Sequence, residues 1–259
     1  MLKGRPGVIK VVKNGSFVGI VASTSYHAKN AANWARKNGQ WESNIKEPFN
    51  LFKNLKNVNT KPETVIESRD VNKNSGTWFE ITASRPFIYH GSIGPATAIA
   101  KAEKDKITIF SHSQGVFQLR QAIAKVLNTA EEKICVIHKP GSGCYGHNGA
   151  DDVAFDAVLM AKSVPGRFLK VVWARFDEFH SSPMGASMVT KSRALLSSNN
   201  RVVAFDVELN STPHTNRPSA NFPNLRAAVY LANPISPSRT PDCLLYTSDA
   251  ADEGLGVDL

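Results

Sequence analysis

The sequence predicts an α+β protein, in which strands and helices are mixed along the chain. Two patterns lead to this prediction. Short β-branched runs recur between residues 8 and 209, and among them lie segments whose apolar residues are three and four apart, as on one face of a helix. The two patterns follow one another irregularly, whereas a doubly wound parallel sheet requires regular alternation.

The first elements are expected to be a hairpin and a helix. Residues 8–12 and 17–22 are apolar runs separated by Asn14-Gly15, a strong hairpin signal. A helix is expected from residue 25 to about residue 38, because a hydroxyl residue that can cap it precedes it and Gly39 follows it.

The rest of the chain continues the mixed pattern. Residues 42–76 are rich in Lys, Asn, Pro and Ser, so a long loop or boundary region is expected there. Apolar runs predict strands at residues 78–83, 107–110, 134–137, 168–175, 188–196 and 201–209. Helical spacing predicts helices at 116–127 and at about 151–163. The last two strands are expected to pair across residues 197–200.

Composition excludes several classes of protein. The 259 residues are 42% hydrophobic, which argues against wholesale disorder, and no apolar run is long enough for an integral membrane segment. Three Cys at irregular spacing do not form a disulfide or zinc framework. Residues 1–62 carry eleven Lys and Arg against two acids, which raises the alternative of a basic binding module. These cations are scattered among Asn without stacking aromatics, so no nucleic-acid partner is expected.

The first motif that could carry out chemistry is Ser111-His112-Ser113-Gln114-Gly115, between an expected strand and an expected helix. A Ser at such a turn is typical of the nucleophile elbow of α/β-hydrolases, and Asp177 and His214 follow in triad order. The elbow requires Gly two residues before the nucleophile, where this chain has Ser111. A serine hydrolase that uses Ser113 therefore remains an alternative function.

The second motif is the Gly-rich run from Gly141 to Asp152, also between an expected strand and an expected helix. Four Gly in nine residues let a backbone approach a bound group closely and present several N–H donors to it. The run lacks the Lys-Ser/Thr of a P-loop and the G-x-G-x-x-G of a dinucleotide site. Cys144 and His147 are too few to form a metal site made by the protein itself.

The stretch 107–218 resembles the molybdenum-cofactor-binding large subunit of the xanthine dehydrogenase/aldehyde oxidase family. It is most similar to the bacterial branch that includes nicotinate dehydrogenase and isoquinoline oxidoreductase. Three blocks carry the resemblance, namely residues 111–115 (SHSQG), 143–152 (GCYGHNGADD) and 173–179 (WARFDEF). Residues 86–95 are similar to the start of that domain. Residues 5–45, with Gly15-Ser16-Phe17-Val18-Gly19, look like the end of an α/β hammerhead domain.

The resemblance implies a fold, a cofactor and a reaction. The expected architecture is a remnant of an α/β hammerhead domain followed by the first half of a molybdopterin-binding domain. Such enzymes hydroxylate a heteroaromatic or aldehyde substrate with water as the oxygen source. The cofactor is molybdenum-molybdopterin, in its cytosine dinucleotide form, and the 2Fe-2S clusters are expected on a partner subunit, since this chain lacks Cys runs to ligate them. The implied small-molecule oxidation is the work of the cofactor, which the protein binds and orients.

The resemblance also implies site residues. The Gln114 amide would donate to an oxo ligand of molybdenum, the Tyr145-Gly146 peptide would lie beside the metal, and the Gly-rich backbone would hold the pterin dithiolene side. The expected cofactor-binding residues are Gln114, Gly115, Gly143, Cys144, Tyr145 and Gly146. No residue matches the family's catalytic glutamate, so the catalytic residues are unknown. Arg175 and Asp177 are expected to form a structural pair at a strand end.

We expect three regions along the chain: a hammerhead-like remnant and linker at residues 1–76, a partial molybdopterin-binding domain at 77–242, and a tail at 243–259. The acidic tail looks like translated adapter sequence. Met1 is expected to lie inside the hammerhead domain rather than at a natural start. On this interpretation the partial chain is inactive alone, and its compartment, cytoplasmic or periplasmic, stays open.

Overall fold

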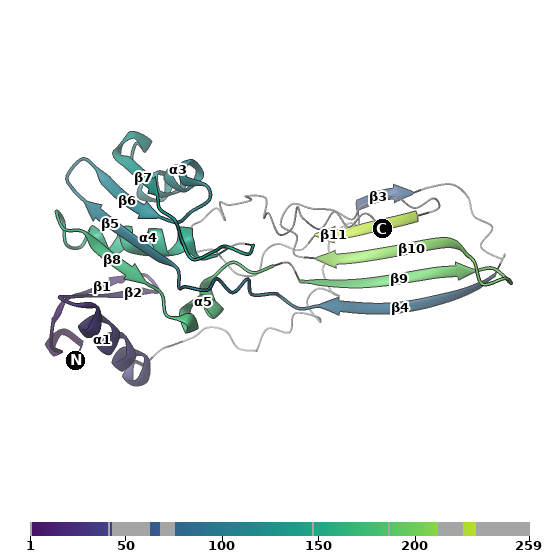
Figure 1. The fold of residues 1–259 in the computed structure, drawn as a ribbon, viewed down its shortest axis with the longest axis horizontal. Helices are drawn as coiled ribbons and strands as arrows, with labels where there is room; N and C mark the ends of the chain where they lie inside the picture. Colours follow the sequence, from purple (N-terminus) through teal and green to yellow (C-terminus); the bar gives the residue numbers. More distant parts are fainter. Residues whose placement is uncertain are drawn as a thin grey trace. The chain divides into compact units, whose positions relative to one another are not determined.

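The computed structural model describes residues 2–40, 42, 63–67, 76–146, 148–185, 187–211 and 225–231. Residues 243–259 lie outside this set. The chain forms two compact units that alternate in sequence (Figure 1). The first draws on Met1–Lys46 and Gly91–Pro183, and the second on Glu47–His90 and Met184–Ser236. The boundary expected between residues 76 and 77 rests on family resemblance and stays a prediction.

The first unit begins with the predicted hairpin and helix. After a short 3-10 helix, η1 (Leu2–Gly4), strands β1 (Val8–Asn14) and β2 (Phe17–Ala22) pair antiparallel. The turn between them needs the positive φ of +57° at Gly15, as Asn-Gly predicts. Helix α1 (Ser25–Asn38) starts where the Thr24 side chain accepts the His27 N–H, and it ends at Gly39.

A four-stranded sheet forms the centre of the first unit, in the order β7-β6-β5-β8. Its strands are β5 (Thr97–Ala102), β6 (Ile107–Ser111), β7 (Ile134–His138) and β8 (Leu169–Val172). β6 and β7 run parallel, while β5 pairs antiparallel with both β6 and β8. β5 was not predicted from the sequence, because its inward positions are all Ala, which has a low strand propensity. The strand expected at 168–175 is wrong beyond Val172.

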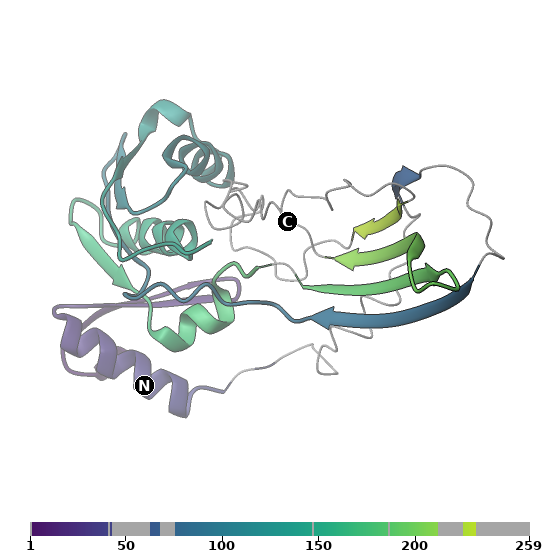
Figure 2. The same ribbon diagram turned by 45° about the vertical axis from the view of Figure 1, so that its right-hand side comes forward.

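Helices complete this unit: α3 (Val116–Leu127), a 3-10 helix η2 (Glu131–Lys133), α4 (Ala150–Ala161) and α5 (Arg175–Ser181). Eleven of the twelve residues of α4 are buried, because it packs against β5, β6 and β8 and also against β2. Figures 1 and 2 show α4 between the sheet and the hairpin. One core cluster therefore joins hairpin residues such as Val21 to residues of the sheet and helices.

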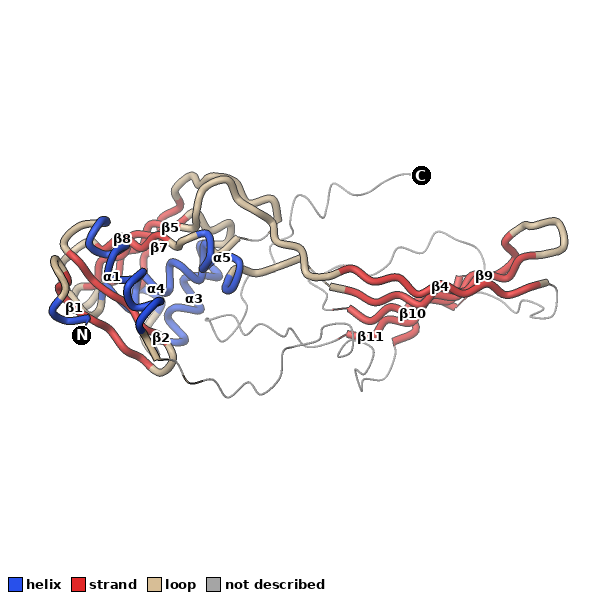
Figure 3. Tube along the Cα trace, turned by 90° about the horizontal axis from the view of Figure 1, so that it is seen from below, coloured by secondary structure: helices blue, strands red, loops and turns tan. Residues whose placement is uncertain are grey.

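The described residues of the second unit are strands and loops (Figure 3). Its five-stranded sheet has the order β3-β11-β10-β9-β4. The strands are β3 (Glu63–Glu67), β4 (Thr77–Arg85), β9 (Met188–Leu196), β10 (Val202–Ser211) and β11 (Leu225–Leu231). β9 and β10 pair antiparallel across residues 197–200, as predicted, and β10 pairs parallel with β11. β3 corrects the loop expected at 42–76, and β11 was not predicted.

The observed mixture of helices and sheets confirms the predicted fold class at that level. Within the described ranges, no helix combines the length and the apolar character that crossing a membrane requires.

Candidate functional site

Two loops follow the carboxyl ends of neighbouring strands in the central sheet. β6 leads into the turn at residues 112–115 and then into α3, while β7 leads into the Gly-rich loop at residues 139–149 and then into α4. Because β6 and β7 are parallel and in register, with Ser111 opposite His138, their carboxyl ends coincide. This edge is the usual place for ligands in sheets with parallel strands.

Hydrogen bonds between residues at or beside the ends of the two loops hold the loops together. The buried Ser111 Oγ donates to Ala150 O at 3.1 Å, and the Lys139 N–H donates to Ser111 O at 2.8 Å. His138 Nδ1 lies 3.0 Å from Ser113 O, so this nitrogen carries the proton and donates it to the carbonyl. The structure therefore brings together the two motifs that were singled out from the sequence.

The Gly-rich loop depends on backbone conformations that favour glycine. Gly143 has φ of +98° and Gly146 has φ of +133°, and the non-glycine Tyr145 between them has φ of +55°. A Cβ at Gly143 would lie 2.6 Å from Tyr145 Cζ. The loop thus folds tightly on itself, in a conformation that side chains at Gly143 or Gly146 would strain.

Asn148 closes this loop with both ends of its amide. Its Nδ2 donates to Gly143 O at 3.1 Å, and its Oδ1 accepts the Ala150 N–H at 3.1 Å. An Asn side chain that binds nearby backbone is common where a loop meets a helix start. This role was missed from the sequence, although Asn148-Gly149 before a helix was a signal that could have identified it.

His112 lies between the two loops and the start of β5. Its Nε2 accepts the Thr97 N–H at 3.3 Å, and its Nδ1 is 3.3 Å from Asn148 Nδ2. Burial lowers the pKa of His112 below the ordinary value of 6.5, and His138 adds to this effect, while Asp151 and Glu178 oppose it. A protonated imidazole could not accept the Thr97 hydrogen bond. The geometry therefore requires the neutral form.

The end of the Gly-rich loop rests on Trp173. A Cβ at Gly149 would lie 2.5 Å from Trp173 Cζ3, so only glycine fits there without movement. The indole N–H of this buried ring donates to Asp156 Oδ2 at 2.9 Å. Asp151 and Asp152 occupy the first turn of α4, as predicted, where carboxylates complement the helix dipole.

The expected cofactor-binding residues all lie in these two loops. Gln114 is exposed on the turn after β6, whereas Gly115 is buried and begins α3, its N–H donating to Ser113 Oγ at 3.1 Å. Cys144 is half-buried with its thiol donating to Gly146 O, and Tyr145 is 52% exposed. His147 lies outside the described residues. The expected role of these six residues in cofactor binding stays a prediction.

The geometry of Ser113 argues against the serine hydrolase alternative. Its side chain is only 1% exposed and accepts the Gly115 N–H, so Oγ is not presented to a substrate. The nearby His138 binds the carbonyl of Ser113 and not its hydroxyl. Asp177 pairs with Arg36 at 3.0 Å, and His214 lies outside the described residues.

The structure corrects the pairing expected between Arg175 and Asp177. Both lie in α5, a segment that was expected to belong partly to a strand. Arg175 pairs instead with Glu178 at 2.8 Å, while Asp177 pairs with Arg36 and accepts the Ala174 N–H. Glu178, to which no role was assigned from the sequence, is 1% exposed.

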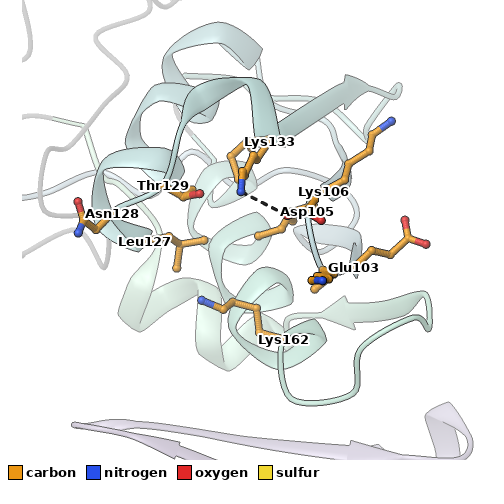
Figure 4. Close-up of a pocket in the computed structure, with 12 residues that line it drawn as sticks. Glu103, Asp105, Lys106, Leu127, Asn128, Thr129, Lys133 and Lys162 are labelled. Carbon is orange, nitrogen blue, oxygen red and sulfur yellow. Dashed lines mark hydrogen bonds and ion pairs between the residues drawn. The ribbon is translucent and has the colours of Figure 1, made fainter.

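A cavity of about 230 Å³ lies elsewhere in this unit (Figure 4). It is lined by the turn between β5 and β6, the end of α3 and the start of β7, and so lies at the opposite end of these strands from the two loops. Lys133 pairs with Asp105 at 3.4 Å beside it. Within the described part of the chain, no group of three or more His, Cys, Asp or Glu could hold a metal ion.

The chain matches known proteins in sequence. Residues 59–217 match the family model described as the molybdopterin cofactor-binding domain, and this range contains both loops. The chain is 29% identical over 236 residues to one of the subunits of nicotinate dehydrogenase from Pseudomonas putida. That match covers 90% of this chain and 19% of the relative, so this chain spans about a fifth of the relative's length.

The fold also matches solved structures. Aldehyde oxidoreductase from Desulfovibrio desulfuricans gives a TM-score of 0.65 at 12% identity, over 90% of this chain and 33% of that one. Quinoline 2-oxidoreductase from Pseudomonas putida 86 gives 0.62 at 14% identity, over 88% and 37%. At these identities the matches establish the fold alone. Because the family model covers more than half of the chain, this chain belongs to the molybdopterin cofactor-binding domain family of molybdenum hydroxylase large subunits.

Proposed function

We propose that this chain binds the molybdenum-molybdopterin cofactor at the edge of the sheet where the loops after β6 and β7 meet. The observation that carries the proposal is that Ser111, the last residue of β6, is hydrogen-bonded to Lys139 and to Ala150, at the two ends of the Gly-rich loop, which keeps the two loops side by side. The sequence signals of the family, SHSQG and GCYGHNGADD, thus belong to one site. The resemblance and the domain match support the same cofactor.

The residues present fit such a group. The backbone at Gly143 and Gly146 has positive φ and no Cβ, which lets main-chain N–H groups approach a ligand closely. Neutral donors of this kind, together with the exposed Gln114 amide, stabilise negatively charged oxygen without binding the metal themselves. In this proposal Gln114 donates to an oxo ligand, and Gly115, Cys144 and Tyr145 complete the cradle.

The chain's contribution is binding and orientation. When bound, the cofactor supplies the redox chemistry for hydroxylating a heteroaromatic or aldehyde substrate with water as the oxygen source. The hydrogen bonds of Ser111 and Asn148, with His112 packed against Gly141, hold the two loops in place, so the donors are positioned before the cofactor arrives. No residue is assigned as the general base.

The larger assembly follows from the resemblance. We propose an iron–sulfur partner subunit that carries 2Fe-2S clusters and receives the electrons, and the cytosine dinucleotide form of the cofactor. The relative from Pseudomonas putida is named as one subunit of its enzyme, which supports a multi-subunit assembly. We also propose that residues 5–45 are the end of a hammerhead domain and that this chain alone does not turn over substrate.

Metal and pterin analysis tests the binding proposal. The chain would be produced with its partner subunit in cells that make the cofactor, and molybdenum and oxidised pterin would be measured per protein. Gly143→Val and Gly146→Val should lose both, because a branched residue is strained at positive φ. Gly4→Ala, where a Cβ meets nothing within 4 Å, should retain both. Absence of molybdenum and pterin from the unsubstituted chain would overturn the proposal.

A further inference from the structure

An ion pair in α5 joins a buried carboxylate, Glu178, to the partly exposed guanidinium of Arg175, and both side chains contact distant backbone. Glu178 is 1% exposed, and both its carboxylate oxygens are engaged, Oε1 by the Ala96 N–H at 2.6 Å and Oε2 by Arg175 Nη1 at 2.8 Å. A buried carboxylate is unfavourable unless it is paired and hydrogen-bonded. Breaking such a pair leaves an uncompensated buried charge.

Arg175 also binds backbone carbonyls outside α5. Its Nη1 also donates to Ser92 O at 2.7 Å, and its Nη2 donates to Ile93 O at 2.8 Å. The planar guanidinium can hold several acceptors at once in a fixed geometry, which a Lys cannot do. Arg175 and Glu178 together therefore hold the segment 92–96 on both sides of Gly94.

The segment held in this way contacts the candidate site at two places. A Cβ at Gly94 would lie 2.5 Å from Ser142 Oγ, so this part of the segment lies directly against the Gly-rich loop. Next to Ala96, the Thr97 N–H donates to His112 Nε2. His112 in turn lies against Gly141 and near Asn148, the residue that closes the loop.

We propose that the Arg175–Glu178 ion pair is the positioning element of the Gly-rich loop, acting through residues 92–97 and His112. Neither side chain is a catalytic residue. The pair fixes the Gly94 and Thr97 backbone, and these contacts fix Ser142 and His112 against the loop. This inference rests on the proposed function only for its consequence, which is lower occupancy by the cofactor when the pair is broken.

Amide hydrogen exchange of the full chain without cofactor tests the positioning role by itself. In Glu178→Gln the amide can still accept the Ala96 N–H, but the charge that holds Arg175 is lost. We expect exchange at Ala96 and Thr97 to rise about tenfold or more, since the Ala96 N–H then donates to a neutral amide instead of a carboxylate and Thr97 is the next residue along the chain. The decisive amide is Ala150, which binds Asn148 Oδ1 and touches neither member of the pair. Its exchange should also rise.

Two controls separate positioning from loss of fold. Exchange in the middle of α3 should stay unchanged in Glu178→Gln, because that helix packs on β7 and away from α5. The variant Arg36→Ala removes a second ion pair of α5, Arg36–Asp177, whose side chains are both exposed. It should leave Ala150 unaffected. Arg175→Lys, which keeps the charge but not the fork, should give an intermediate increase at Ala150.

The outcomes decide between the two proposals. Faster exchange at Ala96 and Thr97 with unchanged Ala150 would show that the pair only anchors the start of β5, and would overturn the positioning role. Uniformly faster exchange, including α3, would overturn it as well, since the pair would then support the whole fold. Pterin content would be measured in parallel. If the unsubstituted chain carries none, the proposed function fails while the exchange data still decide the role of Glu178.

Discussion

The replacement Gly149→Ala measures how closely the Gly-rich loop is packed on the core. Gly149 precedes α4 with φ of −77°, a conformation open to alanine, so the backbone does not oppose the change. The added Cβ would instead lie 2.5 Å from Trp173 Cζ3 and 3.1 Å from Ser182 Oγ. The expected effect is therefore steric.

The size of the expected destabilisation follows from the contacts that hold the indole ring of Trp173 in place. Trp173 is 5% exposed, and its N–H donates to the Asp156 carboxylate, so the ring cannot move away without weakening a buried hydrogen bond. Overpacking alone destabilises by about 1–3 kcal/mol, and a hydrogen bond to a charged group contributes roughly 1.5–3 kcal/mol. Gly149→Ala should therefore lower the free energy of unfolding by about 2–4 kcal/mol.

Urea unfolding followed by circular dichroism measures this loss. Gly4→Ala, where the added Cβ meets nothing within 4 Å, is the matched control and should change the free energy by less than about 0.5 kcal/mol. In a Trp173→Leu background the effect of Gly149→Ala should fall below about 1 kcal/mol, because the overlap with the indole ring is gone and only the milder contact with Ser182 Oγ remains. An equal loss with and without the indole ring would refute this steric explanation.

Three further outcomes can be measured in the same way. Arg193→Ala should lower the free energy of unfolding by about 2–3 kcal/mol, since it leaves the buried Asp206 carboxylate without its cross-strand partner, whereas Lys191→Ala, in an exposed pair, should cost less than about 1 kcal/mol. The pKa of His112 is lower in the folded chain than in the unfolded chain. As the pH falls below 6.5, the unfolded chain therefore binds more protons at His112 than the folded chain does. Unfolding should become easier from pH 7 to 5.5, with a smaller slope in His112→Gln, and equal slopes would contradict the neutral form. Ser111→Ala should lower the free energy of unfolding by about 1–3 kcal/mol, because it removes the buried hydroxyl that binds Ala150 O. An unchanged urea midpoint of unfolding would show that this hydrogen bond is weak.

The features predicted correctly from sequence are the locally determined ones. The Asn14-Gly15 hairpin and the helices at 25–38 and 116–127 depend on turn chemistry and spacing within a few residues. α5 was missed because Ala174 is a poor N-cap, and the cap is supplied instead by the Asp177 side chain, which accepts the Ala174 N–H. β5 was missed because its buried face is made of Ala.

The same difference between local and long-range features applies to the candidate site. The Gly-rich loop and the turn at 111–115 could be identified from composition and family resemblance, since both motifs are contiguous in the chain. The partners that hold them could not. Glu178 binds the backbone of Ala96, which is 82 residues away, and the hydrogen bond of Ser111 spans 39 residues. No periodicity within a short window encodes contacts of this separation.

The double hydrogen bonding of Asn148 makes residues 143–150 resemble a small macrocycle, closed by a side chain instead of a covalent link. Much of the entropy needed to shape such a ring is already lost when the chain folds, because partners outside the ring, among them His112 against Gly141 and Trp173 against Gly149, pack on the loop. The conformation of the loop should therefore depend on the rest of the unit. Grafted into an unrelated scaffold without these partners, the loop should lose its preorganised form.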